Sequence, residues 1–323
     1  TGKSMILALL IGLVAFLTVG KMRGYSLKSM GEMSIEANKS SLVVIKVMLI
    51  IGVLTAVWRV SGTITIFVYY GMKIIMPPIF LLVTFLLCCL LSYAIGTSFG
   101  VAGTVGVIFM ALARSGGVDP FMTAGVVMSG VYFGDRCSPV SSSANMVAGI
   151  TGTKIYDNVK LMFKTGALPF TIALVVYVIL SITNPITSVD QNMIQTFESE
   201  FNISMWSFLP AVLVIGMPLL KISVVKAMMA SIVSAAIIAW LVQGVDITEV
   251  LKICILGYES SSTGLGAILN GGGLVSMLEI VVILIISSSY SGIFSGTKML
   301  DTLQEKIGNA CNFFHCTLPF FVY

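Results

Sequence analysis

The feature that most constrains this fold is a series of apolar runs, several of which are long enough to cross a lipid bilayer. A helix of about 20 apolar residues spans the hydrocarbon core, and only helices and closed barrels satisfy every backbone hydrogen bond in lipid. The runs are Ser4–Gly20, Ser41–Trp58, Pro78–Ile95, Gly166–Thr183, Met205–Leu220, Ser223–Gln243 and Gly273–Tyr290. They predict an all-α polytopic membrane protein.

The composition supports this class. Hydrophobic residues make up 57% of the 323-residue chain and charged residues 10%, with a mean hydropathy of +1.03. Soluble domains carry about 25% charged residues, so this chain has too few charges to cover a water-facing surface. Membrane lipid is therefore the expected partner. The net charge of +4 reports orientation rather than nucleic-acid binding, because basic residues collect in cytoplasmic loops.

The loop charges predict an orientation. The segment after the first run holds Lys21, Arg23, Lys28 and Lys39, and the segment before Gly166 holds Lys154, Lys160 and Lys164. The segment 184–202 holds Asp190, Glu198 and Glu200 with no Lys or Arg. We therefore expect the basic segments inside the cell and the acidic one outside.

Two similar segments predict an internal repeat. Val60-Ser61-Gly62-Thr63 resembles Phe294-Ser295-Gly296-Thr297, and the charge map gives the two units opposite orientations, as in inverted-repeat transporters. We expect a first repeat at 1–183, an external loop at 184–204, and a connecting span with an incomplete second repeat at 205–323. Because Thr1 is not an initiator methionine and the second glycine-rich stretch would follow Tyr323, we expect a truncated chain.

A polar stretch, Leu91–Gly152, interrupts the apolar pattern. Non-helical backbone at membrane depth must be buried or line a cavity, and discontinuous helices are where transporters bind solutes and ions. Helix breaks or a re-entrant hairpin are expected there, since glycine and proline favour breaks; the same small residues also serve close helix packing. The expected break residues are Gly96, Gly100, Gly103, Gly106, Gly134 and Pro139.

Oxygen-bearing side chains crowd the same stretch. Hard cations prefer oxygen ligands, so these residues predict a binding site for an ion or a substrate; the competing interpretation is a polar cytoplasmic loop. The candidate ligands are Thr97, Ser98, Thr104, Asp135, Ser141, Ser143 and Asn145. Na⁺ is assigned to Thr97, Ser98, Ser143 and Asn145. Asp135 and its neighbour Arg136 should pair or face water, because a charge at membrane depth is costly.

Two segments of this stretch resemble a known family. GTSFGVAGTVGV at Gly96–Val107, and PFMTAGVVMSGVYFGDRCSPVSSSANMVAGITGTKIYDNVKLMF further on, resemble the signature of NhaC-type Na⁺/H⁺ antiporters of the ion transporter superfamily. The resemblance implies two inverted repeats, each with a broken-helix or hairpin site. It also implies Na⁺- or H⁺-coupled exchange across the bacterial cytoplasmic membrane, without a bound cofactor.

One position departs from the family pattern. The family usually reads Ser-Asp-Thr-Thr-Asn where this chain reads Ser141-Ser142-Ser143-Ala144-Asn145, so Ser142 replaces the acid. A carboxylate can bind Na⁺ and H⁺ in competition, whereas a serine cannot. Asp135 is then the remaining family-like acid. Coupling to Na⁺ alone, or an organic acid or amino acid as cargo, stays open.

Two further charges fall within predicted spans. Lys46 lies in SLVVIKVMLIIGVL and Glu279 in GLVSMLEIVVILIIS. Aligning Gly62 with Gly296 brings them to matching positions of the two repeats, so we predict an intramembrane ion pair between them. The other interpretation is that each side chain snorkels to the membrane surface.

These observations favour a secondary active transporter, with a Na⁺-coupled organic acid or amino acid transporter and an ion channel as alternatives. An enzyme is not expected, because the chain lacks a Gly-x-Ser-x-Gly elbow and its only histidine is His315. Cys311, His315 and Cys316 lack a fourth ligand for a structural metal site. The expected partner is a small ion or small molecule, and a homodimer stays open.

Overall fold

The computed structural model describes residues 2–74, 79–184, 191–220, 222–260, 266 and 269–297. For a few of these residues it describes only the backbone, namely 2, 3, 40, 72–74, 142, 146, 149–151 and 191–195.

The chain forms two compact units. Unit 1 comprises Thr1–Leu49 with Ser276–Tyr323, and unit 2 comprises Ile50–Val275. Two long helices, α2 (Leu27–Val60) and α15 (Gly273–Gly296), each contribute to both units. This division follows packing rather than internal similarity, so the repeats at 1–183 and 205–323 stay a prediction.

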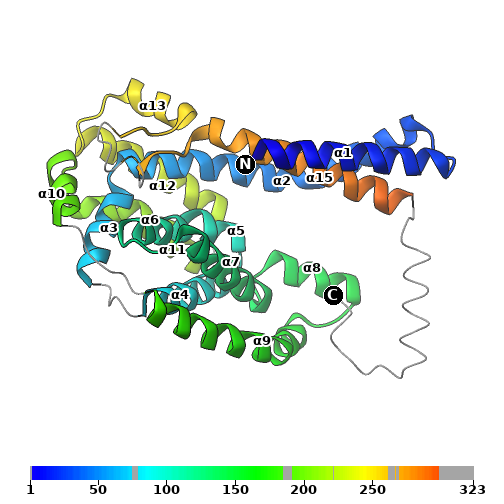
Figure 1. Ribbon diagram of the computed structural model, residues 1–323, viewed down its shortest axis with the longest axis horizontal. Coiled ribbons are helices and arrows are strands. Elements are labelled where there is room, and N and C mark those ends of the chain that lie inside the picture. The colour runs from blue at the N-terminus through cyan, green and yellow to red at the C-terminus, as the bar shows by residue number, and fades with distance from the viewer. Residues whose placement is uncertain are drawn as a thin grey trace. The chain divides into compact units, whose positions relative to one another are not determined.

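Unit 1 is built from α1 (Gly2–Met22) and the unit 1 parts of α2 and α15, which lie side by side in Figure 1. Small residues and hydroxyl groups allow these helices to approach closely, as is usual in membranes. Asn38 Nδ2 donates to Ser289 Oγ at 2.9 Å, and the hydroxyl groups of Ser41 and Ser288 share a hydrogen bond.

The predicted ion pair between Lys46 and Glu279 is not formed in this structure. The ion pairs among the described residues are Lys39–Glu36 and Lys252–Glu249, and both Lys46 and Glu279 are exposed. The contacts at Asn38 and Ser41 set the register: continuing them along the antiparallel helices brings Lys46 level with about Ile283, roughly one turn from Glu279.

Unit 2 holds the remaining helices, and its described residues contain no strand beyond an isolated antiparallel bridge between Tyr258 and Gly271. The helices, in chain order, are α3 (Thr63–Ile74), α4 (Phe80–Ile95), α5 (Ser98–Val101), the π-helical η2 (Ala102–Gly106), α6 (Val107–Ser115), α7 (Pro120–Cys137), α8 (Ser142–Thr151), α9 (Ile155–Thr183), α10 (Gln191–Glu200), η3 (Met205–Phe208), α11 (Leu209–Leu219), α12 (Val224–Leu241) and α13 (Ile247–Leu256).

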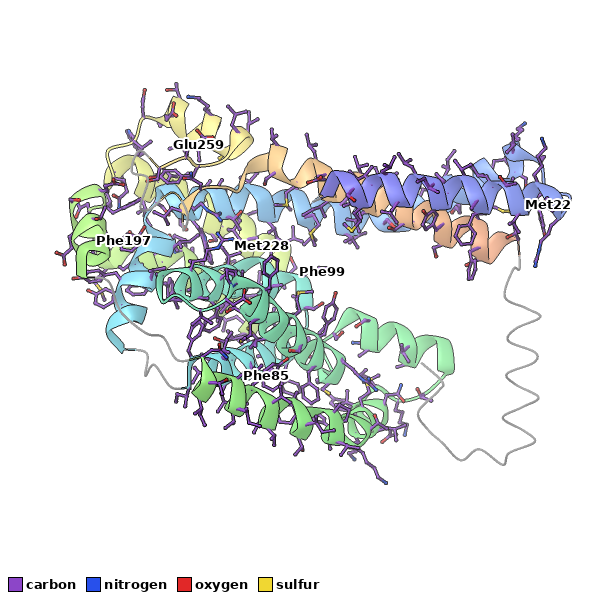
Figure 2. All side chains as sticks on the ribbon, in the orientation of Figure 1. Met22, Phe85, Phe99, Phe197, Met228 and Glu259 are labelled. Atoms are coloured by element: carbon purple, nitrogen blue, oxygen red, sulfur yellow. The ribbon has the colours of Figure 1, made fainter. Side chains whose placement is uncertain are left out.

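In unit 2, α4, α7 and α9 pack closely against one another (Figure 1). A Cβ atom at Gly134 of α7 would overlap the carbonyl oxygen of Cys89 in α4, so the two backbones are nearly in contact. Ser92 Oγ of α4 donates to the Val131 carbonyl oxygen at 2.6 Å. Phe85, labelled in Figure 2, joins α4 to α9 through the ring of Tyr177, whose centroid is 4.9 Å away.

The all-α prediction is confirmed. Among the described residues, six helices are long and apolar enough to span a membrane, and Phe80–Ile95 and Met205–Leu219 are shorter apolar helices. One of the six, Ser98–Ser115, lies in the glycine-rich stretch and was not predicted as a span. The basic segment after α1 is also mostly helical, because α2 begins at Leu27. Pro78 lies outside the described residues.

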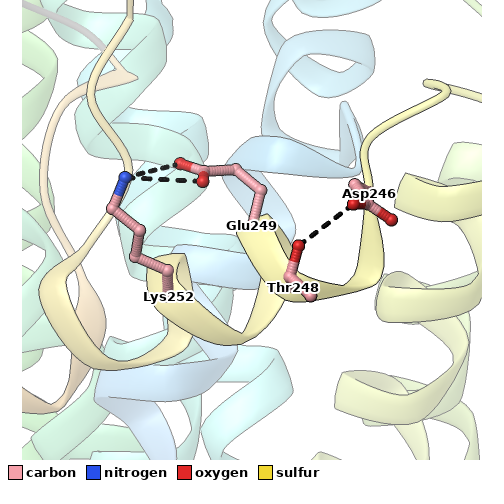
Figure 3. Close-up of polar contacts among 4 residues, drawn as sticks. All are labelled: Asp246, Thr248, Glu249 and Lys252. Carbon is pink, nitrogen blue, oxygen red and sulfur yellow. Dashed lines mark hydrogen bonds and ion pairs between the residues drawn. The ribbon is translucent and has the colours of Figure 1, made fainter.

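A polar cap starts α13 where the chain turns after α12 (Figure 3). The Asp246 carboxylate accepts hydrogen bonds from Ile247 N at 3.0 Å and Thr248 Oγ1 at 3.1 Å, which satisfies a backbone donor that lacks a helical partner. Glu249 and Lys252 form an exposed ion pair at 3.2 Å one turn further on.

Candidate functional site

The first break in the glycine-rich stretch separates α4 from α5. Gly96 ends α4 with a left-handed φ of 76°, and its N–H donates to the Ser92 carbonyl oxygen. The next residue, Thr97, is extended, and its Oγ1 accepts a hydrogen bond from Gly100 N at 3.3 Å, which caps α5. The glycine turns the chain and the threonine restarts the helix, so the break lies within these two residues.

The second break separates α7 from α8. Ser138 is extended and buried, and Pro139 follows it, so the helix stops at Cys137. Ser141 is the N-cap of α8, and its Oγ accepts a hydrogen bond from Ala144 N at 3.3 Å. The predicted break at Pro139 therefore spans Ser138–Ser141.

The two breaks are in contact. A Cβ atom at Gly96 would lie 2.8 Å from the carbonyl carbon of Val140 and 3.0 Å from Ser141 N. Real Cβ atoms do not come this close to backbone, so only glycine fits here. Two non-helical segments more than 40 residues apart in sequence thus cross at one point, where the ends of four helical segments converge. Converging helix ends and unwound backbone are the usual setting of ion sites in transporters.

On the α8 side of the crossing, three predicted ligands lie close together. Ser141 Oγ shares a hydrogen bond of 2.8 Å with Ser143 Oγ. Asn145 Nδ2 donates to the carbonyl oxygens of Pro139 at 3.0 Å and Ser141 at 2.7 Å. These bonds use the nitrogen of the Asn145 amide, so a cation would be coordinated by its oxygen. The side chain of Ser142, the position that departs from the family pattern, lies outside the described part of the chain.

On the α5 side, Thr97, Ser98 and Thr104 follow the first break. Ser98 is buried, and so is Thr104, whose Oγ1 donates to the Gly100 carbonyl oxygen at 2.6 Å. Among the described residues, no hydrogen bond joins these side chains to those of α8. The structure brings the two breaks together, and the Na⁺ ligand set of Thr97, Ser98, Ser143 and Asn145 stays a prediction.

Asp135 and Arg136 lie in the last turn of α7 and do not pair with each other. Arg136 is exposed, and its Nη2 donates to Thr165 Oγ1 of α9 at 3.4 Å. Asp135 is half-buried, and its carboxylate forms no ion pair in the described part of the molecule. A carboxylate beside the C-terminal end of a helix is disfavoured by the helix dipole, so a nearby cation would stabilise it.

The other glycines predicted as breaks lie inside helical segments. A Cβ atom added at Gly103 would lie 2.7 Å from Ile51 Cδ1, and one added at Gly106 would lie 2.9 Å from Val127 Cγ1. Gly134 contacts α4 in the same way. Helix packing, the competing interpretation, describes these three, because each lacks a Cβ atom where a neighbouring helix leaves no room for one. At Gly100 an added Cβ would lie 2.6 Å from Cγ2 of Thr97, the residue that caps its own helix.

Two features of unit 2 were not predicted from the sequence. The glycine run Gly271–Gly273 has positive φ at every residue and packs against α2 at Ala56; three consecutive glycines were a signal for non-helical backbone. Arg59 and Arg114 both line one cavity. Arg59 directly follows an apolar span. Because a charge at membrane depth is costly, this position indicated a functional residue.

The described residues contain no group of three or more His, Cys, Asp or Glu side chains arranged to hold a metal ion. Cys311, His315 and Cys316 lie outside the described residues.

Comparison of the sequence with models of known protein families gives one match. The model of the Na⁺/H⁺ antiporter family matches residues 130–313, which is more than half of the sequence and includes the second break. The chain belongs to the Na⁺/H⁺ antiporter family. This membership and the six apolar helices identify the chain as a multi-pass protein of the bacterial cytoplasmic membrane.

Curated relatives of this antiporter-family chain differ in their cargo. A malate-2H⁺/Na⁺-lactate antiporter of Bacillus subtilis is 27% identical over 316 residues, covering 95% of this chain and 68% of the relative. The Na⁺/H⁺ antiporter NhaC of Alkalihalophilus pseudofirmus is 28% identical over 278 residues, covering 84% and 60%. The arginine/ornithine antiporter ArcD of Halobacterium salinarum is 27% identical over 273 residues, covering 82% and 56%.

The chain thus spans 56% to 68% of the length of these relatives. No solved structure matches it.

Proposed function

We propose that this chain works in a secondary active antiporter and that the crossing of the two breaks forms part of its cation site. The observation that carries the proposal is the contact of Gly96 with Val140 and Ser141. A crossing of this kind collects hydroxyl oxygens, an amide oxygen and helix ends within one small region, and alternating access needs such a site between moving elements.

Na⁺ and H⁺ are the proposed coupling ions. Ser143 and Asn145 supply neutral oxygens beside the crossing, which suits Na⁺. Asp135 lies in the last turn of α7, before Ser138, and is half-buried. Its carboxylate provides negative charge near the site and is the group that we assign to the proton, because a serine at position 142 does not titrate.

The test is Na⁺-dependent exchange in vesicles that contain the intact protein. Asn145→Ala removes the amide oxygen and both backbone hydrogen bonds, and we expect Na⁺-dependent exchange to fall at least tenfold. Asn184→Ala is the matched control, since Asn184 ends α9 and bonds only to Leu180 and Thr183 in the described structure. An Asn145→Ala protein with the Na⁺ dependence of the wild type would contradict the cation site.

Exchange of an organic anion is the second candidate function. One of the relatives is named for organic anions, malate and lactate. The observation that favours an anion in this chain is the cavity lined by Arg59 and Arg114.

A further inference from the structure

A cavity of about 300 Å³ lies in unit 2, lined by residues of α2, α3, η2, α6 and α7. Its walls are mostly apolar or small, with Ile64, Gly106 and Met110 among them. Among the described residues, two charged side chains line it, Arg59 and Arg114, and none of the lining residues is acidic. None of the residues proposed above for the cation site lines this cavity.

Arg59 is incompletely satisfied in this cavity. Its Nη1 donates to the Thr55 carbonyl oxygen at 2.7 Å, within its own helix. Its Nε is buried and has no hydrogen-bond partner among the residues that the structure describes. A buried, unpaired donor on a charged group costs free energy, so the folded protein leaves one edge of this guanidinium group available to a ligand.

The second arginine strengthens the inference. Two guanidinium groups that share an apolar cavity repel each other, and the repulsion is stronger in a low-dielectric site than in water. An anion in the cavity would relieve that repulsion and supply the acceptor that Nε lacks. The planar fork of a guanidinium group matches the two oxygens of a carboxylate.

We propose that this cavity binds a small organic carboxylate, with Arg59 as its anchor and Arg114 compensating its charge. A volume of about 300 Å³ is at the lower end of ligand pockets, which suits a short-chain carboxylate. The apolar walls contact its carbon chain. This proposal rests on the second candidate function, exchange of an organic anion, and assigns the binding residues and the ligand class of its site. It uses none of the residues of the proposed cation site.

A purely structural role for Arg59 predicts different behaviour. Arg59 lies in the last turn of α2, where a cation is favoured by the helix dipole, and its bond to Thr55 fits that role. A helix-capping role needs only this bond and leaves the buried Nε unexplained. Replacing Arg59 with Met should therefore lower the stability of the unliganded protein if Arg59 is structural, and hold or raise it if Arg59 is a ligand anchor.

The binding test uses the intact protein in detergent, with thermal unfolding as the readout. Succinate and lactate are the probes, succinamide has a matched shape without charge, and chloride is a simple anion. We expect a saturable rise in Tm with at least one carboxylate, because a ligand that binds only the folded state stabilises it, and no comparable rise with succinamide or chloride.

Variants then assign the site. Arg59→Gln and Arg114→Gln should each weaken carboxylate affinity at least tenfold, and Arg59→Lys should weaken it less, because it keeps the charge and loses the fork. Arg136→Gln is the matched control, since Arg136 is exposed and bonds to α9. Arg59→Lys and Arg114→Gln keep the test informative if Arg59→Gln does not fold.

Two outcomes would overturn the site: no carboxylate raises the Tm of the wild type, or carboxylates stabilise Arg59→Gln and Arg114→Gln as well as the wild type. An equal response to chloride would overturn its carboxylate character. Failure here is separable from failure of the cation site, because Asn145→Ala should lose Na⁺-dependent exchange and keep carboxylate binding.

Discussion

Gly96 meets two independent constraints at one residue. Its φ of 76° lies in the left-handed region, which costs a residue with a Cβ atom about 1–2 kcal/mol. Its Cα also faces the backbone of Val140 and Ser141, which cannot move aside as a flexible side chain can. The left-handed φ is a property of the end of α4. The close contact with backbone atoms arises only where the two breaks meet.

A pair of substitutions separates these constraints. Gly152 ends α8 with a φ of 65°, and a Cβ atom added to it would meet no described atom within 4 Å. Gly152→Ala should therefore show only the left-handed cost, whereas Gly96→Ala should show that cost plus about 1–3 kcal/mol of overpacking. Thermal unfolding and Na⁺-dependent exchange would be measured for both. Equal destabilisation of the two variants would argue against a tight crossing.

At the scale of elements, the position of each break depends on how α7 packs on α4. Gly130 and Gly134 are spaced as in small-xxx-small helix pairs, and both lie against the α4 backbone. Gly134 is in the last turn of α7 before the second break. The packing of two regular helices therefore positions the irregular backbone that follows them.

Alanine substitutions along α7 test this interface. Gly134→Ala would place a methyl group against the backbone of Cys89 and Tyr93, and we expect a loss of about 1–3 kcal/mol from overpacking. Gly125→Ala is the control on the same helix, because its added Cβ meets no atom within 4 Å in the part of the chain that the structure describes. It should stabilise the helix by up to about 1 kcal/mol. A Gly134→Ala protein as stable as Gly125→Ala would show that α4 and α7 are not tightly packed.

At the scale of the whole molecule, the charges at the two ends of α9 predict how the chain crosses the membrane. Lys154, Lys160 and Lys164 lie near its beginning, and the acidic residues Glu198 and Glu200 lie beyond its end. Tyr69 OH donates to Glu198 Oε1 at 2.7 Å, so α3 lies at the same end of unit 2 as the acidic segment. The positive-inside rule places this end outside the cell.

Cysteine labelling in whole cells tests this orientation. In a protein without its native cysteines, Ser199→Cys should react with a membrane-impermeant thiol reagent added outside. Lys160→Cys should react only after the membrane is opened. Both positions are exposed in the structure, so accessibility within the fold does not limit the reaction. The reverse pattern would invert the proposed orientation.

Local properties of the sequence predicted much of this fold. Hydropathy identified the apolar helices, and glycine and proline chemistry identified Gly96 and Pro139, because these signals act within a few residues. The helix Ser98–Ser115 was missed because its glycines look like breaks in sequence, whereas in the structure they make room for Ile51 and Val127. The start of α2 was missed because its charged residues look like a loop, although Glu36 and Lys39 pair along the helix.

Features that depend on contacts between residues far apart in sequence could not be predicted from the sequence. The crossing joins Gly96 to Ser141, and neither segment alone indicates that they meet. The register between Lys46 and Glu279 was inferred from an alignment of glycines, while the helices are aligned by Asn38 and Ser41. The cavity at Arg59 and Arg114 needs five helical segments to enclose it, so no single motif encodes it.

The π-helical turn η2 has a consequence for how the two proposed sites are spaced. It lies between the break at Gly96 and the end of α6, and Ala102 and Gly106 from it line the arginine cavity. A π turn holds one residue more than an α turn, and one residue corresponds to about 100° of rotation around a helix. In an uninterrupted α-helix from Ser98 onward, Arg114 would therefore project about 100° away from its present direction. The extra residue of the π turn therefore determines the direction in which Arg114 projects, relative to the crossing of the two breaks.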